Sequence, residues 1–386
     1  MKTKFLRAVL VATVGLVTFL VGCQTTASAT SENSANPPKL SDLKVLMTIG
    51  AGTPMTPAFS PDVTDYSLSV HSDVVAVGIV ISVDRASRGG VLVNNQMVDP
   101  GKAVDVKLAV GDNTIAVVVS GANHSTTGYA LHVNREDMQP VIDKFLKASY
   151  TDTATGITMG YRLFVPADYG STRSYPLVLF LDGAGGRGND NEVQLTGTQG
   201  ATVWAKPEEQ AKHSCLVLAP QCPSDHTGQT GWTSLMSKGP SDPYKPRPEL
   251  ETAYHILQDV VSKYNVDKNR VYCTGLSMGG FGTWAIAILH PDTFAALVEE
   301  SGGGDPANIA KVAQLPVWIF HSVKDLTIPI SFAKSTVSAL MKAGGKPKYT
   351  EYADDTSFYP NAHFAWVPAY ANAEMRDWLF QQSKGS

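Results

Sequence analysis

A serine between two glycines places the strongest constraint on how this chain folds. Gly275-Leu276-Ser277-Met278-Gly279 follows the short apolar run 271–273 and precedes the small and apolar residues 280–289. A strand, a sharp turn and a helix in this order form a nucleophile elbow, in which glycines leave room where a Cβ would collide. The pattern predicts that Ser277 lies at a helix N-terminus, where the backbone N–H of Met278 faces a developing oxyanion. A strand-to-helix loop without chemistry is the alternative.

The composition is that of a globular protein with a sizeable core. The chain has 386 residues, of which 43% are hydrophobic and 17% are charged, and its formal net charge is −4. This negative balance argues against electrostatic binding to nucleic acid. No Cys-x-x-Cys or Cys/His spacing suggests a metal site. We therefore expect neither a metal nor another cofactor.

Residues 1–23 have the features of a targeting segment. Lys2, Lys4 and Arg7 form a positive start, and residues 8–20 form an apolar stretch that is short for a transmembrane helix. Removing these three cations from the net charge of −4 leaves −7. The end of the segment, Leu20-Val21-Gly22-Cys23, resembles a bacterial lipobox, which implies a lipidated Cys23 and a membrane anchor. An ordinary secretory signal is the alternative, and both place the protein outside the cytoplasm, at the cell surface, in the periplasm or secreted.

Residues 24–38 are rich in Ser, Thr, Ala and Asn and predict a flexible tether. Residues 39–136 instead show short alternating runs separated by turn residues, which predict an all-β sandwich. The expected strands are 66–70, 104–108, 114–119 and 129–133.

The region 39–136 resembles the cadherin-like, immunoglobulin-like β-sandwich modules of bacterial surface proteins. The resemblance rests on Leu40-Ser41-Asp42-Leu43, on 57–61 and 64–66, and on the runs 108–117 and 129–135. The region shows no residues that point to chemistry, so we expect a spacer or stabilising role. Binding to a glycan, to a partner or to the catalytic domain is the alternative, and fold analogy alone does not decide it.

From residue 137 to residue 386, apolar strands alternate with helical patterns, which predicts an α/β domain with a mainly parallel sheet. Residues 175–181 form a continuous apolar run, as expected for a central strand buried on both faces. We expect a connecting helix over 137–149 and a last helix over 368–381. The other predicted strands are 161–166, 215–220, 295–298, 315–320 and 348–352, and the other predicted helices are 249–264 and 331–343.

An elbow serine needs a base and an orienting acid, which follow it in the order acid, then histidine, in α/β-hydrolases. Of the histidines after Ser277, His290 lies at a helix end, where we expect a capping role, and His321 ends a strand, where we expect a structural role. His363 instead follows the last strand. We therefore predict that His363 is the base. Asp325, which follows the penultimate strand, is the predicted acid. The alternatives are Glu300 and Asp305, with Asp354 and Asp355 expected to be solvated.

The glycine-rich loop 182–191 follows the central strand, which is where a second oxyanion donor is needed. A phosphate-cradling loop is the alternative, but the Gly-x-x-x-x-Gly-Lys-Ser/Thr pattern is absent. We predict that the N–H of Gly183 completes the oxyanion hole with that of Met278.

Residues 161–380 resemble the secreted α/β-hydrolase family of bacterial carboxylesterases, which is related to feruloyl esterases and serine peptidases. The matching stretches are 161–166, 175–181, 183–191, 219–223 with Trp232, the elbow, and 363–366. The resemblance implies a triad of Ser277, Asp325 and His363, an oxyanion hole from Gly183 and Met278, and an ester substrate of small-molecule or polysaccharide-linked type. Trp232 and Trp366 are the candidates for the substrate pocket, with a place in the core as the alternative for Trp232.

The chain departs from that family at two places. Asp182 stands where family members usually have histidine, and a carboxylate beside an oxyanion is unfavourable unless it is paired, for which Arg187 is the candidate. Glu299-Glu300 replaces a more apolar strand end.

If Cys23 is lipidated, three cysteines remain: Cys215, Cys222 and Cys273. Three cysteines form at most one disulfide, for which Cys215 and Cys222 are the candidates, and free thiols are the alternative.

These patterns together predict a surface-anchored serine carboxylesterase, with feruloyl or acetyl esters as reasonable substrates. A serine peptidase with the same triad is one alternative. A non-catalytic adhesion protein, carried by the β-sandwich, is another.

Overall fold

The computed structural model describes residues 37–48, 50–84, 89–122, 124–170, 172–225, 230–234, 245–353 and 358–385. The predicted targeting segment with Cys23 and nearly all of the predicted tether lie outside these residues. Within them, no helix combines the length and the apolar character that crossing a membrane requires.

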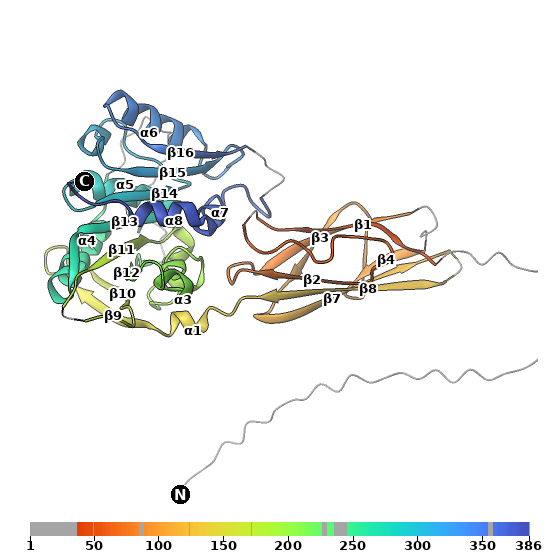
Figure 1. Cartoon of the computed structure of the whole chain (residues 1–386). Coiled ribbons are helices and arrows are strands. Elements are labelled where there is room, and N and C mark those ends of the chain that lie inside the picture. The colour runs from red at the N-terminus through yellow and green to blue at the C-terminus, as the bar shows by residue number, and fades with distance from the viewer. Residues whose placement is uncertain are drawn as a thin grey trace, which may run out of the picture. The chain divides into compact units, whose positions relative to one another are not determined.

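Two β-sheets within residues 40–135 enclose one apolar core (Figure 1). The first has the order β1-β3-β6 and is antiparallel. The second has the order β2-β8-β7-β4-β5 and is antiparallel except for the parallel pair β2–β8. The strands are β1 (Leu40–Leu46), β2 (Asp65–Val70), β3 (Ala76–Val83), β4 (Gly90–Val93), β5 (Gln96–Val98), β6 (Ala103–Lys107), β7 (Gly111–Ser120) and β8 (Thr126–Arg135).

The alternating pattern of the sequence accounts for this sandwich. In β2, Tyr66, Leu68 and Val70 are buried while the residues between them are exposed, as a strand with one covered face requires. The four strands predicted from the sequence correspond to β2, β6, β7 and β8, and the all-β prediction for this region is confirmed.

An eight-stranded sheet organises the rest of the chain, in the order β16-β15-β14-β13-β11-β12-β10-β9. Its strands from β16 to β12 are parallel, while β10 runs antiparallel to both β12 and β9. The strands are β9 (Phe145–Thr151), β10 (Thr158–Phe164), β11 (Tyr175–Leu181), β12 (Leu216–Pro220), β13 (Val266–Leu276), β14 (Ala296–Glu300), β15 (Val317–Ser322) and β16 (Lys348–Tyr352).

Helices cover both faces of this sheet, so each central strand is buried on both sides. In β11, Leu177 and Leu179 belong to a core with α4, α5 and α6, whereas Val178 and Phe180 belong to a second core with α7 and α8. The helices are α1 (Gln139–Ile142), α2 (Val193–Thr196), α3 (Pro207–Gln210), α4 (Pro248–Lys263), α5 (Met278–Leu289), α6 (Ser331–Lys342), α7 (Trp366–Ala371) and α8 (Ala373–Phe380), with short 3₁₀ turns at Ala184–Gly186, Thr202–Ala205 and Ile309–Val312. The mainly parallel α/β prediction is confirmed.

Two helix predictions need correction. Residues 137–149 do not form one helix: α1 ends at Ile142, because Phe145–Thr151 pairs with β10 as the edge strand β9. The last helix is divided at Asn372, whose extended backbone ends α7 and whose side chain accepts hydrogen bonds from the N–H groups of Glu374 and Met375, capping α8.

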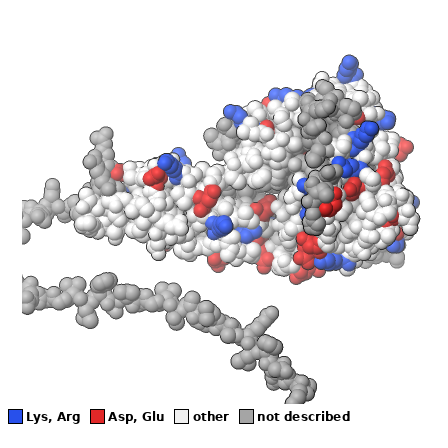
Figure 2. All heavy atoms as spheres, turned by 180° about the vertical axis from the view of Figure 1, so that it is seen from behind, with Lys and Arg blue, Asp and Glu red and all other residues white. Residues whose placement is uncertain are grey.

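Acidic and basic side chains are interspersed on the face of the molecule shown in Figure 2, without a continuous basic stripe on that face.

Candidate active site

Ser277 lies at the turn between β13 and α5, as the elbow pattern predicts. Its backbone has φ +54° and ψ −116°, a strained conformation for a residue with a Cβ. The turn is tight enough that a Cβ at Gly279 would overlap the carbonyl oxygen of Leu181, and one at Gly275 would overlap that of Gly279. The two glycines are therefore required where the elbow crosses β11.

The side chains of Ser277, His363 and Asp325 form a hydrogen-bonded line. Ser277 Oγ lies 2.9 Å from His363 Nε2, and His363 Nδ1 lies 2.7 Å from Asp325 Oδ2. His363 is buried, and its backbone is held at both ends: its N–H donates to Asn361 Oδ1, and its carbonyl accepts from Ser301 Oγ, each at 2.9 Å. The structure thus brings together the three residues that chain order predicted.

The Asp325 carboxylate has a donor on each side. Oδ1 accepts from the N–H groups of Thr327 and Ile328, both at 2.8 Å, and Oδ2 faces both His363 and His321. Burial alone would raise the pKa of Asp325, but the hydrogen bonds from the two histidines and the backbone outweigh it and hold the pKa well below its usual range. Asp325 is therefore ionised next to His363.

The other acids considered are occupied elsewhere. Glu300 is buried and accepts from Tyr370 Oη at 3.1 Å, and Asp305 accepts hydrogen bonds from residues of its own loop. Asp354 and Asp355 lie outside the described residues.

His321 contacts the same carboxylate from behind, although the sequence suggested a structural role. It is completely buried; its Nε2 lies 2.8 Å from the carbonyl oxygen of Ile328 and 3.4 Å from Asp325 Oδ2. A carbonyl only accepts, so Nε2 carries a proton. Burial lowers the pKa of His321, but the hydrogen bond to Asp325 and the charge of Glu299 outweigh it and raise the pKa. The spacing His321-x-x-x-Asp325 at a strand end was the available signal for this contact.

The backbone of Gly183 passes next to the elbow. A Cβ there would lie 2.6 Å from Leu276 Cδ1 and 3.7 Å from Ser277 Cβ. The N–H of Ser277 already donates to the carbonyl of Glu300 at 2.8 Å. Met278, by contrast, is the first residue of α5, and a first-turn N–H has no acceptor within its helix. Gly183 and Met278 are thus placed beside Ser277, as predicted.

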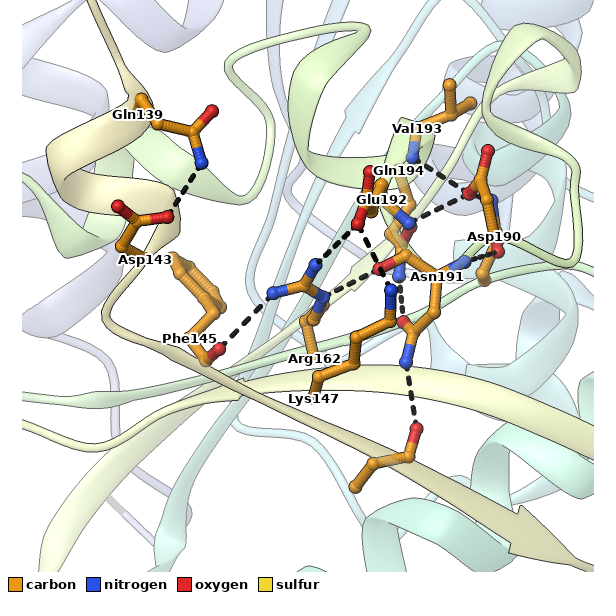
Figure 3. Close-up of polar contacts among 12 residues, drawn as sticks. Gln139, Asp143, Phe145, Lys147, Arg162, Asp190, Asn191, Glu192, Val193 and Gln194 are labelled. Carbon is orange, nitrogen blue, oxygen red and sulfur yellow. Dashed lines mark hydrogen bonds and ion pairs between the residues drawn. The ribbon is translucent and has the colours of Figure 1, made fainter. Parts of the chain in front are cut away.

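A polar network centred on the buried Arg162, Asn191 and Gln194 fixes the loop that follows Gly183 (Figure 3). Arg162 on β10 donates from Nε to the carbonyl of Asn191 at 2.6 Å and from a terminal nitrogen to that of Phe145 at 3.3 Å. Gln194 donates to Asn191 Oδ1 at 2.6 Å, and Asp190 Oδ1 accepts from the N–H of Val193, the first residue of α2, at 3.2 Å. The network ties the loop and α2 to the sheet, so the glycines before it are held in place.

A pocket of about 370 Å³ opens at Ser277 and His363. Its wall is mostly apolar or small. It is lined by Asp182, Gly183, Ala184, Gly185, Gly186, Val193, Gln194, Gly197, Thr198, Leu276, Ser277, Thr327, His363, Phe364 and Trp366. Such a concave, largely apolar site with a few convergent polar groups is typical of small-molecule binding.

The comparisons with known proteins agree with this geometry. Residues 153–371 match the family model described as "Putative esterase", and residues 40–136 match that of the cadherin-like beta sandwich domain. The chain belongs to this esterase family. Residues 40–136 are its cadherin-like sandwich, and the α/β region is its esterase domain.

One solved structure and two curated relatives that resemble this chain are also named esterases. A solved thermostable esterase is 34% identical, with 79% of this chain and 80% of that chain covered and a TM-score of 0.60. The "Putative esterase NocK" of Nocardia uniformis subsp. tsuyamanensis is 27% identical over 55% of this chain. The "Probable feruloyl esterase C" of Aspergillus terreus is 27% identical over 44% of this chain. The chain spans 58% and 56% of the lengths of these two curated relatives.

One of the two tryptophans predicted for the substrate pocket lies in the core instead. Trp366 lines the pocket, but Trp232 is completely buried in the core and does not. The Trp232 indole N–H donates to the carbonyl of Asp182 at 2.9 Å, and its side chain covers Gly282 so closely that a Cβ there would lie 2.9 Å away. Trp232 therefore supports the loop behind Gly183 instead of facing the substrate.

Asp182 is buried without the partner that the sequence suggested. Its Oδ1 accepts from the N–H of Cys222 at 3.4 Å, while Oδ2 has no hydrogen-bond partner. Arg187 instead donates to the carbonyls of Ala184 and Thr230. Burial raises the pKa of Asp182 well above its usual range, which favours the neutral form of the group beside the proposed oxyanion donors.

The thiols of Cys215, Cys222 and Cys273 are free and buried. A possible set of metal ligands among the described residues lies away from the pocket: Glu209, His213 and Asp377 have ligand atoms within 4.8 Å of one another. Glu209 Oε2 is ion-paired with Arg376 at 2.7 Å, and His213 is hydrogen-bonded to Asp377 at 2.7 Å, whereas the buried Glu209 Oε1 has no hydrogen-bond partner.

Proposed function

We propose that this protein is a serine carboxylesterase that uses Ser277, His363 and Asp325. The observation that carries the proposal is the hydrogen-bonded line from Ser277 Oγ through His363 to Asp325, at 2.9 Å and 2.7 Å, beside an apolar pocket. Nucleophile, base and orienting acid in this geometry are the parts that acyl transfer requires.

In the proposed mechanism, His363 Nε2 takes the proton of Ser277 as Oγ attacks the ester carbonyl carbon. Asp325 stabilises the imidazolium, and its backbone hydrogen bonds keep it ionised while it does so. The tetrahedral intermediate collapses when His363 gives this proton to the departing alcohol. Water then attacks the acyl-enzyme with His363 again as base, which releases the acid and restores Ser277.

The N–H groups of Gly183 and Met278 are proposed to bind the oxyanion. One such donor contributes about 10²–10³-fold to the rate in related chemistry. The neutral state favoured for Asp182 supports this role, since an ionised carboxylate next to the same donors would oppose the developing charge.

The pocket supports an uncharged ester as substrate. Apart from the buried Asp182 and His363, none of the described lining residues is ionisable, and Phe364 and Trp366 offer aromatic surface. We propose feruloyl or acetyl esters linked to plant polysaccharide, a proposal supported by a relative named as a feruloyl esterase. The negative net charge of −4 argues against nucleic acid as a partner.

The test is hydrolysis of p-nitrophenyl acetate, p-nitrophenyl butyrate, methyl ferulate and a peptide p-nitroanilide by the full chain and by Ser277→Ala. We expect ester turnover that falls by about 10⁴–10⁶-fold in the variant. Peptide turnover with negligible ester turnover would favour a serine peptidase. If neither substrate class is turned over, the esterase proposal fails and the adhesion alternative gains support.

The location of the protein is a separate proposal. We propose that Cys23, in Leu20-Val21-Gly22-Cys23, is lipidated and anchors the esterase to a membrane outside the cytoplasm. The chain should then fractionate with membranes after expression in a bacterial host, and Cys23→Ala should release it or leave the precursor uncleaved. Equal fractionation of mature wild type and variant would contradict the anchor.

A further inference from the structure

A glycine on the outer face of the sandwich is covered by a residue of the esterase domain. In β3, Val77 and Ile79 face the sandwich core, so Gly78 between them points outward, yet Gly78 is buried too. The cover is Tyr359: a Cβ at Gly78 would lie 2.6 Å from Tyr359 Cζ and 2.9 Å from its hydroxyl oxygen. Only glycine leaves room for this ring.

Two further groups of the sandwich hold Tyr359. Asp105 on β6 pairs directly with Gly78 across the β3–β6 ladder, and its carboxylate accepts a hydrogen bond from the Tyr359 hydroxyl. Thr48 is buried and donates from Oγ1 to the carbonyl of Tyr359 at 2.9 Å. Ring, hydroxyl and backbone of Tyr359 are therefore all fixed by the sandwich.

Tyr359 begins the segment that carries His363. The segment is short and internally bonded, since Asn361 accepts from the N–H of His363 at its side chain and from that of Phe364 at its carbonyl. Phe364 and Trp366 follow and line the pocket. The sandwich also meets the far end of this segment, where a Cβ at Gly50 would lie 3.1 Å from Pro368 Cα.

A second contact reaches another part of the pocket wall. Gln199 donates from Nε2 to Asp73 of the sandwich at 3.3 Å, and it directly follows Thr198, which lines the pocket. Close by, Lys206 is paired with Glu136 at 2.8 Å. The sandwich thus contacts two separate segments that adjoin residues of the pocket wall.

Given the esterase activity proposed above, we infer that the β-sandwich is a positioning element of the active site: by holding Tyr359 and Gln199, it sets the place of His363 and of the pocket wall. If the sandwich were only a spacer, its covalent link to the esterase domain would be sufficient. Its contacts would then have no reason to lie on the segments that contain Tyr359 and Gln199. His363 must lie within hydrogen-bond reach of Ser277, and a displacement of about 1 Å in such a group costs on the order of 10²-fold in rate. A rigid support outside the esterase domain supplies that precision.

The experiment uses full-length variants on the sandwich side of the contact. Gly78→Val suits a strand but displaces the Tyr359 ring. Asp105→Ala removes the acceptor of the Tyr359 hydroxyl, whereas Asp105→Asn keeps an acceptor oxygen. Asp99→Ala is the matched control, because Asp99 is an exposed sandwich carboxylate paired with Lys102.

Two readouts are taken at a temperature at which every variant is folded by circular dichroism. The first is kcat and KM for p-nitrophenyl butyrate. The second is hydrogen–deuterium exchange of peptides that span residues 358–366, which needs no turnover. We expect Gly78→Val to lower kcat by about 10–100-fold with a smaller change in KM, and to speed exchange in 358–366. Asp105→Ala should do the same less strongly, and Asp105→Asn should recover most of the loss.

The outcomes separate this inference from the proposed esterase function. If the wild type turns over esters and Gly78→Val does so equally, with unchanged exchange in 358–366, the sandwich has no positioning role. If Asp99→Ala lowers kcat as much as Gly78→Val, the effect is general destabilisation and the inference is again overturned. If no ester is turned over by the wild type, the esterase proposal fails, and the exchange of 358–366 still decides whether the sandwich holds this segment.

Discussion

The sandwich and the esterase domain bury different kinds of side chain. Among the described residues of the sandwich, Thr48 is the sole buried polar one, and the core consists of alternating apolar residues of two sheets. The esterase domain buries eight carboxyl side chains. Asp182 lines the pocket and Asp325 contacts His363, whereas Asp152, Glu209, Glu249, Glu299, Glu300 and Asp305 contact neither Ser277 nor His363 through their side chains. A buried charge is costly unless it is paired or neutralised. The difference teaches that the esterase domain accepts this cost at several places, two of which belong to the proposed site, whereas the described core of the sandwich is apolar.

Among the buried acids, the largest expected effect is that of Asp325→Asn on activity. The amide oxygen can replace Oδ1 toward the N–H groups of Thr327 and Ile328, but the amide N–H₂ then faces the protonated nitrogens of His363 and His321. His363 would take the wrong tautomer, and we expect kcat to fall by about 10⁴-fold. Steady-state hydrolysis of p-nitrophenyl butyrate measures it.

Asp305→Asn is the control for this change, because Asp305 is a buried acid after the neighbouring strand that bonds only within its own loop. A loss below about tenfold in Asp325→Asn would show that another acid orients His363, and the contrast between buried charge and chemistry would not hold.

A substitution in the core of the sandwich, in contrast, should lower the free energy of unfolding and leave kcat unchanged. Ile115 on β7 is buried in the shared core, away from the contact at β3 and β6. Ile115→Ala should cost about 2–5 kcal/mol of the free energy of unfolding, and Ile115→Val about 0.5–1.5 kcal/mol. Thermal and urea unfolding measure the loss, and kcat is measured where both variants are folded. A fall in kcat that parallels the loss of stability would break the division of roles.

Sequence patterns were sufficient where a structural rule acts locally. The alternation of β2, the apolar run of β11 and the glycines around Ser277 each follow from sterics within a few residues, so both domains and the elbow could be predicted. Chain order then selected His363 and Asp325 without knowledge of their contacts.

Long-range packing is what the sequence could not reveal. Trp232 was expected near the substrate because tryptophan suits both a pocket and a core, and only the position of Asp182 and Gly282 decides for the core. His321 was assigned a structural role because its contact with Asp325 depends on the turn that follows β15. The cover of Gly78 by Tyr359 joins residues in two domains, for which no local pattern exists.

The buried Glu300 should make stability depend on pH. Burial and the charge of Glu299 raise the pKa of Glu300 well above its ordinary value, so the group keeps its proton when folded but loses it when unfolded. The unfolded state then binds fewer protons, and stability falls as pH rises above the ordinary glutamate pKa, by about 1.4 kcal/mol per pH unit until the folded group also ionises. Glu300→Gln should remove this slope and gain stability over the wild type at neutral pH, but not at acidic pH.

Urea unfolding across the acidic and neutral range tests the slope, with Glu374→Gln, an exposed glutamate, as the control. Parallel pH dependence of wild type and Glu300→Gln would mean that Glu300 is ionised in the folded protein. Burial raises the pKa of Glu299 to about 7, so Glu299 adds its own pH dependence to the stability near neutral pH in both proteins.

The smallest expected effect is that of Asp182→Asn, and it should appear only at alkaline pH. Burial raises the pKa of Asp182, so the wild type carries a neutral acid beside Gly183 at neutral pH, and the isosteric amide should leave kcat/KM within about threefold. As pH rises through the folded pKa, Asp182 ionises next to the oxyanion donors and activity falls, whereas the amide cannot ionise. The pH profile of kcat/KM should therefore extend further into the alkaline range in the variant.

Burial also raises the pKa of the neighbouring Cys222 thiol, so ionisation of this thiol does not compete as the cause of the fall in kcat/KM at alkaline pH, the alkaline limb of the profile. Asp168→Asn, at an exposed ion pair with Arg173, serves as control. Coincident alkaline limbs in wild type and Asp182→Asn would mean that the esterase domain tolerates a charge at this position, and that burial alone does not mark the groups on which its chemistry depends.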